Sequence, residues 1–121
     1  MGDGPLEKEI YGGLIRLHVL HHACHEPVFG LGIIEELARH GYAVSPGTMY
    51  PILHGLERAG YLESRLEKVG ARNRRVYEAT KAGCKALQKA KGRVSELFLE
   101  LFEDELKRPA PKGRATRERS R

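Results

Sequence analysis

The chain has few of the features that mark secreted or membrane proteins. It holds only two cysteines among 121 residues, too few for the disulfide framework of a small secreted domain. It has no run of 18 apolar residues, so we expect no membrane span. Residues 1–5 are followed by charges rather than by an apolar signal segment. These absences together favour a cytoplasmic protein.

Signatures of catalysis are also missing. The sequence contains no G-x-S-x-G turn, no phosphate-binding P-loop and no H-E-x-x-H metal motif. Cys24 and Cys84 lack both a CxxC spacing and an evident acid–base partner, which favours two buried thiols over a redox site. We therefore predict a protein that is not an enzyme and that carries no cofactor.

What the chain does have is an uneven distribution of positive charge. The net charge is +5, yet residues 107–121 alone hold seven lysines and arginines against one glutamate. Residues 65–93 hold ten lysines and arginines against two glutamates, whereas residues 94–106 hold five acids and no base. Positive charge at 65–93 is placed where a nucleic-acid backbone could be contacted. Residues 108–121 are predicted to be a disordered basic tail, either an ordinary solvated terminus or an aid in holding DNA.

The most informative segment is a predicted short helix over residues 46–58. Ser45 can cap its start, Pro46 suits the first helical position and Gly60 suits the stop. One face is apolar and consists of Met49, Ile52, Leu53 and Leu56. The opposite face is small, polar and weakly basic, and consists of Gly47, Thr48, Pro51, His54, Gly55 and Arg58, with Tyr50 at its edge. Such a helix is suited to lying in a DNA major groove.

The neighbouring segments complete a recognisable order of elements. Helices are predicted over 6–23 and 30–40, with a break at 24–29 and a turn at 41–45. Strands are predicted over 62–68 and 74–80 around a turn at 70–73, followed by a last helix from about 80 to before Pro109. We predict a mostly α winged helix-turn-helix with a two-stranded β wing. Its parts are a DNA-binding domain at 1–80, a dimerisation helix at 81–107 and the tail at 108–121.

Two runs of this sequence resemble the PadR family of transcriptional regulators. The first is Ser-Pro-Gly-Thr-Met-Tyr-Pro from Ser45, continued by Leu-x-x-Leu-Glu and Gly-Tyr-Leu up to Leu62. The second is Arg-Arg-Val-Tyr from Arg74, followed by Thr-Lys-Ala-Gly from Thr80. The resemblance covers about residues 10–106, and a Tyr-Pro pair inside a helix is unusual enough to be specific.

The resemblance implies a sequence-specific DNA-binding regulator, usually a repressor that an effector releases from a palindromic operator. The positions that match the family's DNA-contacting positions are Ser45, Gly47, Thr48 and Tyr50. For Arg75, an alternative to DNA contact is an ion pair with Glu63 or Glu67 across the hairpin. The full set of predicted DNA-binding residues is Ser45, Gly47, Thr48, Tyr50, Pro51, His54, Arg58, Lys68, Arg72, Arg74 and Arg75.

The last helix is too apolar for the small preceding core to cover, which predicts a homodimer. Leu87, Val94 and Leu101 recur at intervals of seven. The resemblance implies packing against the partner's first helix. The predicted interface is Leu14, Leu17, Leu87, Val94, Leu97, Phe98, Leu101 and Phe102. The resemblance also implies that a small-molecule effector binds between the first and last helices. The candidate effector residues are Leu14, His18, Phe98 and Phe102, and the same four residues are equally candidates for the dimer core.

Two alternatives remain open on the sequence. The first is a metal-sensing repressor, because four histidines at helical spacing, followed soon by Pro27, share one helix face; they are His18, His21, His22 and His25. Packing or pH-sensitive contacts are the other interpretation of this row. The second alternative is a winged-helix protein-interaction module in which only the basic tail contacts nucleic acid.

Overall fold

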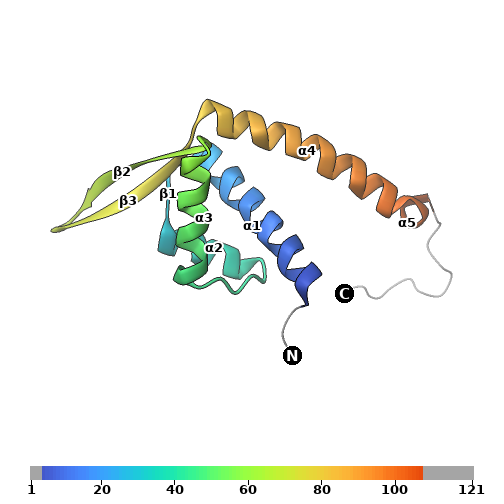
Figure 1. Ribbon diagram of the computed structural model, residues 1–121, viewed down its shortest axis with the longest axis horizontal. Coiled ribbons are helices and arrows are strands. Elements are labelled where there is room, and N and C mark those ends of the chain that lie inside the picture. Colours follow the sequence, from blue (N-terminus) through green and yellow to red (C-terminus); the bar gives the residue numbers. More distant parts are fainter. Residues whose placement is uncertain (1–3, 108–121) are drawn as a thin grey trace. The chain divides into compact units, whose positions relative to one another are not determined.

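The computed structural model describes residues 4–107, so the predicted basic tail at 108–121 lies outside the described residues. These residues form two units, one ending at Ala90 and the other starting at Lys91. Their elements follow the chain in the order shown in Figure 1: α1 (Pro5–His25), β1 (Val28–Phe29), α2 (Gly30–Arg39), α3 (Pro46–Arg58), β2 (Leu62–Val69), β3 (Arg72–Ala79), α4 (Lys81–Leu101) and α5 (Glu103–Lys107).

The predicted helices are present, with two corrections to their ends. α1 extends two residues into the break expected at 24–29 and ends at His25, shortly before Pro27. The single last helix is divided, because α4 ends at Leu101 and α5 starts at Glu103. No helix within residues 4–107 combines the length and the apolar character that a bilayer span requires.

The predicted two-stranded wing is a three-stranded antiparallel sheet in the order β1-β3-β2. Val28 pairs with Tyr77 and Phe29 pairs with Val76, so β1 joins the base of the hairpin to the helices. A strand of two residues after a proline shows no alternation, which is why the sequence pattern missed it. The hairpin turn is also tighter than expected, with Gly70 at φ +64° and strand pairing that begins at Val69 and Arg72.

The first unit encloses one hydrophobic core, and the residues with the least exposure come from α1, α2, α3, β2 and β3. They are Val19, Leu37, Met49, Leu53, Leu62 and Tyr77. Burial raises the pKa of the Tyr77 phenol, as does the nearby charge of Glu57. Leu87 at the start of α4 belongs to the same core and is 6% exposed. The structure thus assigns Leu87 to the chain's own interior rather than to a surface for a second copy.

Thr80 fastens the start of α4 to the connection between α3 and β2. Its backbone N–H donates to the Tyr61 carbonyl at 3.0 Å, and its hydroxyl donates to the Gly60 carbonyl at 2.6 Å. The same hydroxyl accepts the Gly83 N–H at 3.0 Å, which caps the first turn of α4. Gly60 has φ +88°, as expected for the residue that ends α3.

The two cysteines correct the prediction of buried thiols. Cys24 near the end of α1 and Cys84 in the first turn of α4 form a disulfide, with their Cα atoms 5.9 Å apart. Both residues are half-buried. The sequence offered no sign of the pairing because the two residues are 60 positions apart.

Candidate nucleic-acid interface

α3 follows the turn at 41–45 and separates its residues into a buried and an exposed face. Met49, Ile52, Leu53 and Leu56 are all buried in the core, as the sequence predicts. The polar side of the helix is exposed, and six of the predicted DNA-binding residues lie there: Ser45, Gly47, Thr48, Pro51, His54 and Arg58. The helix therefore has a continuous outer face that the chain's own core does not cover.

The entry to α3 leaves its hydroxyl groups near the surface. The Ser45 carbonyl accepts the N–H groups of Thr48 at 3.0 Å and Met49 at 2.9 Å, so Ser45 is the N-cap residue by its backbone. Its side chain makes no capping hydrogen bond, contrary to our expectation. The Ser45 hydroxyl instead lies 3.4 Å from the Thr48 hydroxyl. Two neighbouring hydroxyls at a helix N-terminus suit hydrogen bonding to a phosphate or a base edge.

Tyr50 differs from the other candidates on this helix. Its ring is half-buried against the core, and its hydroxyl lies so close to Gly30 that a Cβ atom there would overlap it. Gly30 starts α2, so the tyrosine fixes the distance between α2 and α3. This packing gives the Tyr-Pro pair of the sequence run a structural role, while DNA contact by Tyr50 stays a prediction.

The hairpin tip carries two cations with no competing partner. Lys68 and Arg72 are exposed beside the Gly70 turn, and neither has an ion pair or a side-chain hydrogen bond within residues 4–107. Their charges are thus available to a polyanion. This arrangement matches the wing tip that the sequence predicts.

The next two arginines of the wing have partners inside the protein. The guanidinium of Arg74 lies 3.8 Å from the centre of the Phe29 ring and 3.3 Å from a Glu67 carboxylate oxygen. Arg75 donates to the Ser64 hydroxyl at 3.1 Å. It does not form the cross-hairpin ion pair with Glu63 or Glu67 that the sequence left open. Arg74 therefore helps to hold the hairpin against β1, whatever else it contacts.

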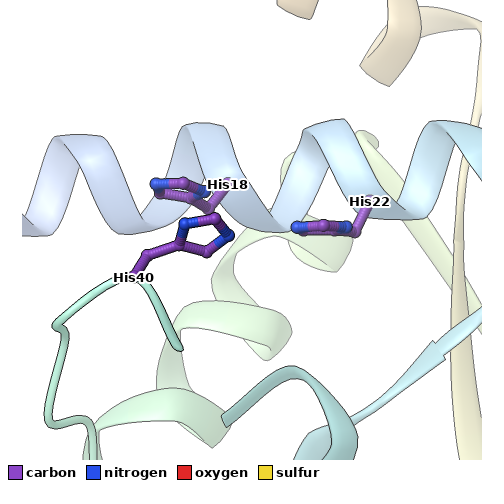
Figure 2. Close-up of side chains that lie close together, drawn as sticks. All are labelled: His18, His22 and His40. Atoms are coloured by element: carbon purple, nitrogen blue, oxygen red, sulfur yellow. The ribbon is translucent and has the colours of Figure 1, made fainter. Parts of the chain in front are cut away.

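The four predicted histidine ligands do not gather into one group. His25 contacts the His21 carbonyl through Nδ1 at 2.7 Å, and the rings of these two residues lie 4.7 Å apart. His18 and His22 face His40 instead, the residue that follows α2 (Figure 2). Burial lowers the pKa of His18, and the positive charges of His40, His22 and His21 lower it further against the opposing effect of Glu36.

An open groove of about 1040 Å³ lies next to His40 and the start of α3. Its walls come from the first half of α1, the turn at 41–45 and the start of α3, including Tyr11, Tyr42 and Thr48. The four effector candidates Leu14, His18, Phe98 and Phe102 do not line this groove. The groove is therefore a second hollow to consider for a small molecule, beside the one that the sequence predicts.

The geometry agrees with the comparison to known proteins. Residues 19–89 match the transcriptional regulator PadR-like family, which is more than half of the chain. The chain belongs to the PadR family. This PadR regulator has a winged helix fold in which α2, the turn and α3 form the helix-turn-helix and β2–β3 form the wing.

Relatives of this PadR regulator include a curated protein and several solved structures. The transcriptional regulator Rv3488 of Mycobacterium tuberculosis is 48% identical over 95 residues, which cover 78% of this chain and 89% of the relative. A PadR family regulator from Eggerthella lenta is 25% identical with a TM-score of 0.70, covering 86% and 91% of the two chains. A PadR-like transcriptional regulator from Bacillus cereus superimposes with a TM-score of 0.73 at 22% identity, covering 84% of this chain and 99% of that chain. This similarity is one of fold.

Several contacts that shape this PadR regulator's site had no signal in the sequence. Glu57, a member of the run that resembles the family, accepts the Ser64 N–H at 3.2 Å and the Ser64 hydroxyl at 2.8 Å, which ties α3 to β2. Phe29 supports the wing through Arg74. His40 joins two histidines of α1 although it lies far from them in sequence. Each contact depends on how elements pack, so residue spacing along one helix did not reveal it.

Proposed function

We propose that this PadR-family regulator binds double-stranded DNA in a sequence-specific manner, with α3 in the major groove. The observation that carries the proposal is the exposed outer face of α3, from Ser45 to Arg58, on a helix whose other face is fixed in the core. Hydroxyl and imidazole groups there can hydrogen-bond to base edges and phosphates. Lys68 and Arg72 add salt-dependent attraction to the backbone, because each neutralised phosphate releases counterions.

We further propose that the regulator acts as a homodimer on a palindromic operator. Large apolar side chains are exposed on both units, including Leu6 and Ile10 on α1 and Leu97 and Leu101 on α4, at 48–66% exposure. Exposed apolar area of this kind is typical of an interface. A two-fold dimer would present two copies of α3 to half-sites about 34 Å apart. The predicted interface is as given above, without Leu87.

Repression in the cytoplasm and release by a small-molecule effector complete the proposal. Leu14, His18, Phe98 and Phe102 remain the candidate effector residues. The rings of Phe98 and Phe102 lie 5.0 Å apart and are tilted by 44°, as in an ordinary aromatic pair. A compound that fits such a site should lower the affinity for DNA. The Phe98→Ala variant should lose that response. Because Phe98 also belongs to the predicted interface, the response is compared at concentrations at which light scattering shows both chains to be dimers.

The test of DNA binding uses the segment upstream of the protein's own gene, searched for an inverted repeat. Fluorescence anisotropy with this duplex and a scrambled duplex should show preference for the repeat. His54→Ala should reduce that preference by about 1–3 kcal/mol, the usual worth of a base contact. The control Lys107→Gln removes one charge at α5 and should leave the preference unchanged. Equal affinity of the intact protein for both duplexes would exclude sequence-specific binding.

A truncation separates this proposal from the protein-interaction alternative. A chain that ends at Lys107 lacks the basic segment 108–121 but keeps α3 and the wing. Under our proposal it binds the operator with similar sequence preference and a smaller dependence on salt. If truncation abolishes binding altogether, the winged helix is a docking scaffold and the tail was the only nucleic-acid contact.

A further inference from the structure

Three histidines from two helices come together on the surface of the first unit. His18 and His22 lie one turn apart on α1, and His40 follows the end of α2. Figure 2 shows the three rings close together, and one ring nitrogen of each lies within 4.8 Å of the others. Among the residues at 4–107, this is the group of histidine, cysteine and acidic side chains that could share a metal ion.

A carboxylate stands beside the three rings. Glu36 on α2 places Oε2 at 3.4 Å from Nε2 of His40 and 3.9 Å from Nε2 of His22. Its other oxygen is held by Arg39, which fixes the orientation of the group. A carboxylate next to imidazoles is the usual partner of histidine ligands, because it orients the ring and raises its basicity.

We propose that His18, His22 and His40 bind one divalent transition-metal ion, with the Glu36 carboxylate orienting the His22 and His40 rings from outside the ligand set. Three imidazoles, with water at the remaining position, suit Zn²⁺, Co²⁺, Ni²⁺ or Cu²⁺. Cys24 is not available as a thiolate ligand, because it is bonded to Cys84. The site therefore differs from the four-histidine row of the sequence in its third ligand, His40, which follows the end of α2.

The positions of the rings require only a small adjustment. In a tetrahedral site with metal–nitrogen distances of about 2.1 Å, ligand nitrogens lie about 3.4 Å apart. The three nitrogens already lie within 4.8 Å. His18 and His22 are half-buried and His40 is exposed, so their side chains can rotate toward a shared ion. Burial lowers the pKa of His18, and this shift favours metal binding because only the neutral ring binds an ion.

The histidines left out of the site provide a built-in control. His25 is exposed at the end of α1, three residues after His22, and lies on the same helix face as His18 and His21. Its Nδ1 contacts the His21 carbonyl at 2.7 Å. Replacing His25 therefore removes a surface histidine of the same helix without touching the proposed ligands. An adventitious histidine row would respond to this change, and the three-histidine site would not.

The test uses the full chain without a histidine tag, stripped of metal by a chelator. Isothermal titration with Zn²⁺, Co²⁺, Ni²⁺ and Cu²⁺ should show one ion per chain for at least one of them, and the Tm should rise with that ion. Loss of a residue that only supports a ligand lowers metal affinity by about 10- to 100-fold. A larger loss of metal affinity is expected for each ligand variant, His18→Gln, His22→Gln and His40→Gln. Glu36→Gln should fall within that range, and His25→Gln should match the original chain.

Spectroscopy adds a measurement that a general loss of structure would not mimic. The Co²⁺-loaded chain should show ligand-field absorption bands, which His40→Gln should lose while its circular dichroism stays unchanged. No heat and no Tm shift with any of the four ions would overturn the proposal. So would equal affinity of His40→Gln and the original chain, or a loss in His25→Gln as large as in His18→Gln. DNA binding is measured separately, so either proposal can fail alone.

Discussion

Glycine at position 83 shows how a single residue sets the approach of the start of α4 to the rest of the first unit. A Cβ atom built on Gly83 would overlap the backbone carbonyl oxygen of Tyr61. That carbonyl also accepts the Thr80 N–H, so it is not free to move away. The glycine is therefore required by contact between two backbones, since its φ is not in the left-handed region.

We predict that Gly83→Ala lowers the free energy of unfolding by about 1–3 kcal/mol, the usual range for overpacking. Gly92 in the same helix is the matched control, because a Cβ there meets nothing within 4 Å. Gly92→Ala should be neutral or stabilising by about 0.5–1 kcal/mol. Urea unfolding of the two variants measures both values. Equal stability of the two variants would show that the Tyr61 contact does not constrain α4.

Two arginines of the wing differ in their surroundings, because Arg72 has no partner within residues 4–107 and Arg74 helps to hold the hairpin. Arg72→Ala should weaken binding to all DNA sequences alike and lower the salt slope by about one unit, with no change in Tm. Arg74→Ala should lower the Tm as well, because it removes the Phe29 contact and the Glu67 pair. Salt-dependent anisotropy and thermal unfolding of both variants check this. An unchanged salt slope in Arg72→Ala would remove the hairpin tip from the DNA surface.

At the scale of elements, the disulfide joins the end of α1 to the start of α4. The disulfide closes a loop of 60 residues. The chain-entropy treatment gives a stabilisation of about 4 kcal/mol for a loop of that size, and measured stabilisations are typically about 2–4 kcal/mol. We predict that Cys84→Ser, or added dithiothreitol, lowers the stability of the first unit by that amount. The Cys84→Ser variant should not respond to dithiothreitol. A response there would mean that the reductant acts elsewhere.

Helices and the main hairpin were predictable from sequence because their signals are local. The apolar stripe from Met49 to Leu56 follows helical spacing, and the three buried positions Leu62, Val76 and Tyr77 lie on predicted strands. The exposed face of α3 followed directly from that stripe. β1, the disulfide and the third histidine depend on contacts between distant segments, for which one sequence contains no periodic signal. The same limit applies to Leu87, whose heptad spacing suits an interface and an interior equally.

At the scale of the whole molecule, exposed apolar side chains in the second unit are the basis of the dimer proposal. Phe98 is 48% exposed and Leu97 is 53% exposed. Phe98→Glu should convert the proposed dimer to a monomer in light scattering. Leu87→Ala is the contrasting variant. It should lower the free energy of unfolding by about 2–5 kcal/mol, because Leu87 is in the core. At temperatures where this variant is folded, light scattering should still show a dimer. A monomeric original chain would contradict the dimer proposal.

The proposed metal site is connected through the turn at 41–45 to α3, the helix proposed to bind DNA. His40 lies at the start of the turn that leads through Tyr42 to Ser45, and the Tyr42 ring lies 5.3 Å from that of His18. An ion that ties His40 to α1 would restrict this turn before DNA arrives, so less ordering remains to oppose binding. We therefore predict that the bound metal tightens operator binding by about fivefold or more.

Linkage makes this prediction testable in both directions. If metal raises the affinity for DNA by some factor, DNA must raise the affinity for metal by the same factor. Anisotropy with chelated and metal-loaded protein gives the first factor, and metal titration with and without operator gives the second. His40→Gln should abolish both effects and retain the chelated protein's DNA affinity, because its side chain lies outside the face of α3. Equal or weaker DNA binding with metal present would show that the turn is already rigid, or that the ion holds it in a geometry unsuited to the groove.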